Sequence, residues 1–115
     1  MPKESIQFYY KPTWTTCRKA RSFLQEKKIH VQERDYVKEP FAEKELQELI
    51  GDRDVKIFLN TRNELVQKLG WKNNPPTKSQ FIQQALQEPN VIKRPILKKG
   101  DKLVLGFDEE EFLGL

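Results

Sequence analysis

The residues best suited to chemistry lie in a short stretch that follows an apolar run. Cys17 is the only cysteine of the 115-residue chain, and it comes directly after Trp14, Thr15 and Thr16, at the predicted start of a helix. A thiol in the first turn of a helix feels the partial positive charge of the helix N-terminus, which favours the thiolate. Basic residues nearby add to this effect: Arg18, Lys19 and Arg21. A strand, a loop and a helix N-terminus with a thiol form the layout of a thiol-redox site.

Cys17 nevertheless has two interpretations. Its spacing places it with Ala20 on the apolar face of the helix, where it would pack as a small hydrophobic residue. Alternatively it is a reactive monothiol, since exchange with glutathione needs only one attacking thiolate. Trp14 cannot be a nucleophile, so it either fills space in the loop or stacks against a partner. Cys17 is therefore a candidate catalytic thiol, and Trp14, Thr15 and Thr16 form a candidate binding loop.

Arg94, directly before Pro95, is the other candidate site residue. Its guanidinium can hold an oxyanion or a carboxylate through two hydrogen bonds, or it can form an ion pair at the surface. His30 is the only histidine, which excludes a histidine-rich metal site, and we expect no metal. The sequence contains no glycine-rich phosphate loop, zinc-ligand spacing or Ser/His/Asp arrangement.

The elements that position these residues are predicted from apolar spacing and turn residues. Residues 6–10 read as a strand. A helix capped by the hydroxyl of Thr15 or Thr16 should run to about Lys28, and residues 29–36 read as a second strand, which gives a βαβ unit with a parallel pair. Pro40 should open a further helix.

The rest of the chain reads as a helical middle followed by a ββα unit. Residues 55–70 look helical with a break, and residues 77–80 form a capping box. The helix that follows should bury Phe81, Ile82, Ala85 and Leu86. Residues 96–105 form a hairpin, and Asp108 with Glu111 caps a last helix whose apolar residues are Phe112, Leu113 and Leu115. We expect a single domain over residues 1–115.

Composition narrows the class of protein. Charged residues make up 33% of the chain and give a net charge of +4, but they are interspersed, so we expect a solvated surface rather than direct nucleic-acid binding. One cysteine cannot form an intramolecular disulfide, which argues against a secreted, disulfide-stapled domain. No signal peptide or run of about 18 apolar residues is present. The sequence predicts a cytoplasmic monomer that does not bind membranes.

Three motifs and their order resemble the arsenate reductase (ArsC)/Spx family. Residues 12–20 are similar to the family's Pro-x-Cys-x-Thr-Cys/Ser-Arg-Lys-Ala segment, residues 93–96 to its Arg-Pro-Ile signature, and residues 105–110 to its Val-Gly-Phe/Tyr-acidic run. Residues 60–70 also resemble the family's middle segment. The resemblance implies an α/β, thioredoxin-like fold with a helical insert and a central mixed four-stranded sheet. It also implies that Pro95 is cis and that its loop lies beside Trp14 and Cys17.

The chain departs from the family pattern at the residues that carry the chemistry. The family's nucleophilic cysteine falls at Trp14, and Cys17 falls at the second cysteine, which in Spx-type members forms a switch disulfide with the first. The arginine that helps to hold the oxyanion in arsenate reductases falls at Asn60, whereas Arg94 is retained.

Two functions follow from the resemblance. The first is thiol-redox ancestry of the arsenate-reductase type, linked to glutathione and glutaredoxin. Activity would be weak or absent, and at most Cys17 would act as a monothiol with glutathione as co-substrate and no bound cofactor. The second is an Spx-like module that contacts the RNA polymerase α subunit, with Arg62 as the candidate contact, or another protein-interaction role.

Overall fold

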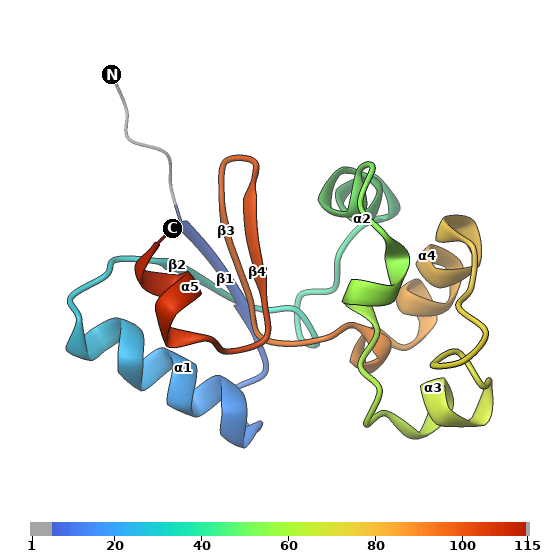
Figure 1. Cartoon of the computed structure of the whole chain (residues 1–115), viewed down its shortest axis with the longest axis horizontal. Coiled ribbons are helices and arrows are strands. Elements are labelled where there is room, and N and C mark those ends of the chain that lie inside the picture. The colour runs from blue at the N-terminus through green and yellow to red at the C-terminus, as the bar shows by residue number, and fades with distance from the viewer. Residues whose placement is uncertain (1–5, 115) are drawn as a thin grey trace. The chain divides into compact units, whose positions relative to one another are not determined.

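A four-stranded mixed sheet forms the framework of the first of two structural units (Figure 1). The computed structural model describes residues 6–114, and the first unit holds the described residues up to Tyr36 together with those from Arg94 onwards. The strands lie in the order β2-β1-β3-β4. Their bounds are β1 (Ile6–Tyr10), β2 (Gln32–Asp35), β3 (Ile96–Lys99) and β4 (Lys102–Leu105). The mixed four-stranded sheet predicted above is therefore confirmed.

The pairing of the strands brings three chain segments to one edge of the sheet. β1 runs parallel to β2, with Tyr10 opposite Asp35, and antiparallel to β3, with Tyr9 opposite Ile96. The ends of β1 and β2 and the start of β3 therefore meet. β3 and β4 form the predicted hairpin, which turns at Gly100, a glycine with a left-handed φ of 57°.

Two helices cover one face of this sheet, α1 (Thr15–Glu26) and α5 (Glu109–Leu113). They share an apolar cluster with the strands, which consists of Phe8, Tyr10, Cys17, Ala20, Phe23, Leu24, Leu97, Val104 and Phe112. As predicted, Asp108 caps α5, since its side chain accepts a hydrogen bond from the Glu111 N–H. Leu113, by contrast, is 60% exposed, and Leu115 lies outside the described residues.

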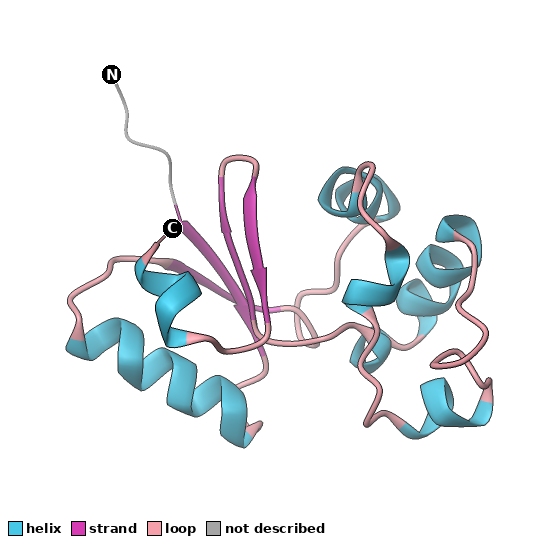
Figure 2. Ribbon diagram, viewed as in Figure 1, coloured by secondary structure: helices cyan, strands magenta, loops and turns pink. Residues whose placement is uncertain are grey.

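The second unit, residues 37–93, consists of helices and loops (Figure 2). Its elements are α2 (Glu43–Ile50), the 3-10 helix η1 (Val55–Phe58), α3 (Glu64–Lys68), α4 (Lys78–Gln87) and the 3-10 helix η2 (Pro89–Val91). The predicted break between η1 and α3 is confirmed, and so is the capping box of α4, in which Thr77 and Gln80 exchange hydrogen bonds.

Two predictions for the second unit are wrong. Pro40 does not open α2, because the Glu45 carboxylate accepts a hydrogen bond from the Ala42 N–H at 2.9 Å and so places the first turn three residues later. Leu86 is 36% exposed, although its neighbours Ile82 and Ala85 are buried. The buried face of α4 is therefore narrower than the face that all of its apolar residues would form.

Candidate functional site

Trp14 occupies the position directly before α1 and begins the candidate site. Its backbone is extended, its N–H donates to the Lys11 carbonyl at 3.0 Å, and its carbonyl accepts from the Arg18 N–H at 3.0 Å. Trp14 is thus the N-cap residue, and no side chain caps this helix. The predicted threonine cap is wrong, because Thr15 and Thr16 are already the first helical residues, whereas a cap must precede them.

The side chain of Arg94 lies against the indole of Trp14. The guanidinium carbon is 4.3 Å from the centroid of the ring system, which is the geometry of a cation–π contact. Arg94 is only 8% exposed, so this contact is largely removed from water. We call Trp14, Tyr36 and Arg94 the Arg94 cluster.

Tyr36 completes the Arg94 cluster and was not foreseen from the sequence. It is fully buried, and Arg94 Nη1 donates a hydrogen bond to its hydroxyl at 3.4 Å. Burial raises the pKa of Tyr36 to about 12, and the positive charge of Arg94 only partly opposes this rise. The tyrosine therefore stays neutral at physiological pH. Its position directly after β2, at the edge where β1 ends, was the signal that could have identified it.

Topology explains why these residues meet. Trp14 follows β1, Tyr36 follows β2, and Arg94 precedes β3, and these three strand ends share one edge of the sheet. The Arg94–Pro95 peptide bond is cis, as the resemblance implies, and the Pro95 carbonyl accepts from the Gly106 N–H at 2.8 Å. The same edge therefore gathers the predicted Trp14, Arg94 and Pro95.

Cys17 lies inside the apolar cluster and has no exposed surface. Burial raises the pKa of its thiol, while a hydrogen bond to the Lys11 backbone and the positive charge of Arg94 act in the opposite direction without overcoming it. The thiol therefore stays protonated at neutral pH. The geometry favours the core interpretation of Cys17, and catalysis by this thiol stays a prediction.

Asn60 and Arg62 lie in the second unit. Asn60 is buried, and its amide nitrogen donates to the Asn90 carbonyl at 3.0 Å while its Oδ1 accepts from the Arg62 N–H at 3.2 Å. Asn60 thus holds a turn between two segments of its own unit. The side chain of Arg62 is exposed on that turn. Thr15 is also exposed, and Thr16 is half-buried.

The side chains and the helix lengths of residues 6–114 bear on two further features, a metal site and a membrane-spanning helix. Within this range, no group of three or more His, Cys, Asp or Glu side chains is arranged to hold a metal ion. None of the helices described there combines the length and the apolar character that crossing a membrane takes.

Comparison with known proteins adds a family context to this geometry. Residues 9–115 match the ArsC family. Global transcriptional regulator Spx 1 of Lactococcus lactis is 30% identical over 108 residues, which cover 92% of this chain and 84% of the regulator. Global transcriptional regulator Spx of Enterococcus faecalis is also 30% identical, over 92% of this chain and 82% of its own.

Solved structures agree with the fold. An ArsC-family-related protein from Bacteroides fragilis superimposes with a TM-score of 0.83 at 27% identity, covering 96% of this chain and 97% of its own. An arsenate reductase from Vibrio cholerae has a TM-score of 0.82 at 21% identity, covering 98% of each chain, and this likeness concerns the fold alone. These neighbours have the ArsC type of thioredoxin-like fold.

Proposed function

Because the chain belongs to the ArsC family, we propose that it is a regulatory binding module of the Spx kind, without arsenate reductase activity. The similar proteins from Lactococcus lactis and Enterococcus faecalis are global transcriptional regulators. The proposed role is to bind a component of the transcription machinery, the C-terminal domain of the RNA polymerase α subunit.

The state of the only thiol is the observation that carries this proposal. Thiol-dependent reduction needs an accessible thiolate, because the thiolate is the attacking species. Cys17 is fully buried, its pKa is raised, and the position that the resemblance assigns to the nucleophile holds Trp14. In addition, the guanidinium of Arg94 is stacked on that indole. The residues at the positions that would carry out thiol-dependent reduction instead pack against one another or against the core.

Arg62 is the proposed contact with the polymerase subunit. Its side chain is exposed, and its backbone is held in a defined turn by the hydrogen bond to Asn60 Oδ1. A long cationic side chain on a fixed turn is a suitable contact for an acidic or polar surface. The net charge of +4 is compatible with such a partner.

Binding to the purified α C-terminal domain tests the proposal. The full chain should bind in a calorimetric titration, and Arg62→Ala should weaken binding at least fivefold. Arg18→Ala, which removes an exposed arginine from α1, is the matched control and should leave binding unchanged. Absence of binding by the parent chain, or equal effects of the two variants, would contradict the proposal. Arsenate turnover with glutathione and glutaredoxin at rates typical of enzymes would refute it independently.

Monothiol exchange with glutathione is a second candidate: burial raises the Cys17 pKa, but the Lys11 backbone hydrogen bond and the charge of Arg94 oppose this rise and favour the thiolate. In that reaction the Cys17 thiolate attacks one sulfur of oxidised glutathione. A mixed disulfide forms and one glutathione thiolate leaves, so atoms and electrons balance. Intact mass measurement of folded protein with oxidised glutathione would detect the adduct. Modification only after denaturation would exclude this chemistry in the folded protein.

A further inference from the structure

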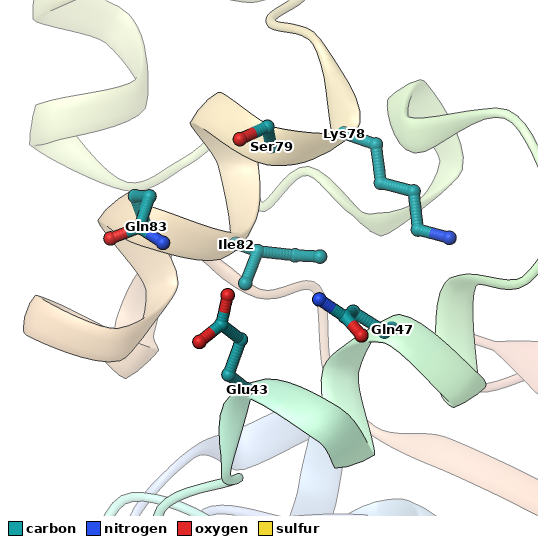
Figure 3. Close-up of a pocket in the computed structure, with 6 residues that line it drawn as sticks. All are labelled: Glu43, Gln47, Lys78, Ser79, Ile82 and Gln83. Atoms are coloured by element: carbon teal, nitrogen blue, oxygen red, sulfur yellow. The ribbon is translucent and has the colours of Figure 1, made fainter.

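A pocket of about 350 Å³ lies in the second unit between α2 and α4 (Figure 3). It is open to solvent on one side. Two residues of α2 and four of α4 line it, and these are Glu43 and Gln47, then Lys78, Ser79, Ile82 and Gln83. Because residues four apart lie on one face of a helix, each helix turns a polar stripe toward the pocket.

The floor of the pocket is apolar and its rim is polar. Ile82 is only 3% exposed, and Figure 3 shows its side chain in the space between α4 and the α2 residues Glu43 and Gln47. The rim residues are exposed or half-buried, so they keep their polar groups in water. The pocket therefore suits a ligand group with a hydrocarbon stem and a polar head.

The position of the charged residues around the pocket indicates which charge the polar group of the ligand carries. Glu43 is the one acidic residue that lines the pocket, and its carboxylate points toward Ile82 in Figure 3. The Lys78 ammonium points away from Glu43 and donates a hydrogen bond to the Gly51 carbonyl, at the end of α2, at 3.1 Å. A cation is then attracted by Glu43, whereas an anion would be repelled by it.

We propose that this pocket binds an arginine side chain of a protein partner. The Glu43 carboxylate can accept two parallel N–H bonds from a guanidinium, and the amide oxygens of Gln47 and Gln83 can accept others. The methylene stem of the arginine would lie on Ile82. A lysine ammonium offers three donors from a single point and cannot form the paired bonds, so arginine fits this set of acceptors better.

The shape of the pocket indicates that the arginine belongs to a partner chain. Sites for free small molecules usually enclose most of the ligand surface, and they span roughly 300–1,000 Å³. This pocket is at the lower end of that range and is open, so a side chain that projects from a partner's surface can enter it while its main chain stays outside. The proposal is independent of the Arg94 cluster, which lies in the other unit.

Titration of the isotope-labelled full chain by NMR tests the proposal, with N-acetyl-arginine amide as the probe. Saturable shifts should appear in the side-chain amides of Gln47 and Gln83. The isosteric neutral probe N-acetyl-citrulline amide should bind about two- to fivefold more weakly, which is the effect of one ion pair at a partly exposed site. No saturable shift with the arginine probe, or an equal response to citrulline, would overturn the proposal.

Two variants and one further probe complete the test. Glu43→Gln should weaken binding of the arginine probe about two- to fivefold, whereas Glu48→Gln, on the same helix but outside the pocket lining, should not. Equal effects of the two variants would overturn the assignment to this pocket. Free arginine differs from the capped probe only in its charged main-chain groups and should bind no tighter. A tenfold preference for free arginine would overturn the assignment to a protein partner.

Discussion

The contact between Trp14 and Arg94 predicts a measurable coupling of their contributions to stability. The guanidinium carbon lies 4.3 Å from the ring centroid, and Arg94 is only 8% exposed. Cation–π contacts are worth about 0.5–1 kcal/mol at exposed sites and about 2 kcal/mol when desolvated. A double-mutant cycle with Trp14→Leu and Arg94→Met, which keep apolar bulk at both positions, should therefore give a coupling of about 1–2 kcal/mol.

Urea unfolding followed by circular dichroism measures this coupling without relying on tryptophan fluorescence. Arg21 supplies a control cycle with Trp14, because it is also an arginine but lies in α1, about 10 Å from Trp14 along the helix axis. It pairs with Glu33 instead, at 2.6 Å. The Trp14–Arg21 coupling should stay within about 0.5 kcal/mol of zero. A Trp14–Arg94 coupling no larger than this control would refute the view that the indole and the guanidinium stabilise each other.

Two further predictions concern single side chains. Because the pKa of Tyr36 is raised from 10.0 to about 12 in the folded protein, the unfolded chain loses this proton first as pH rises. Ionisation of Tyr36 should leave the free energy of unfolding unchanged below pH 10 and should lower it by roughly 2–3 kcal/mol between pH 10 and pH 12. Urea unfolding against pH should show a smaller fall for Tyr36→Phe, and an unchanged fall would contradict the assignment. Thr77→Ala removes the hydroxyl that accepts a hydrogen bond from the Gln80 N–H, so it should lower the free energy of unfolding in urea by about 1 kcal/mol. The control variant Ser79→Ala should lower it by less than about 0.5 kcal/mol. Equal losses would argue against the capping box.

Local patterns in the sequence were sufficient for much of the fold. The apolar run that marks β1, the capping box at Thr77 and the hairpin that turns at Gly100 depend on residues close together in the chain. The family resemblance supplied the overall arrangement. In contrast, Pro40 and the threonine pair misplaced two helix starts, because several nearby residues can begin a helix and the competition between them is decided in the folded structure.

The candidate site was predictable only in part, because its contacts join distant segments. Trp14 and Arg94 were identified from the chain, but their stacking depends on strand ends that the sheet brings together. Tyr36 is not distinguished as a site residue by the sequence, since an aromatic residue at the end of a short strand is usually part of the core. The burial of Cys17 was one of two open interpretations, because spacing alone does not say how deeply a residue is covered.

The accessibility of Cys17 tests the central claim. This claim is that the thiol is packed in the apolar core and does not take part in a reaction. The rate of alkylation by iodoacetamide should be measured against pH by intact mass, with Cys17→Ser as the unreactive control. We expect folded protein to react at least about 100-fold more slowly than protein in urea, because only opened molecules expose the buried thiol. Rapid labelling of the folded protein, with an apparent pKa well below the roughly 8.5 of a free thiol, would contradict the claim and restore a redox function.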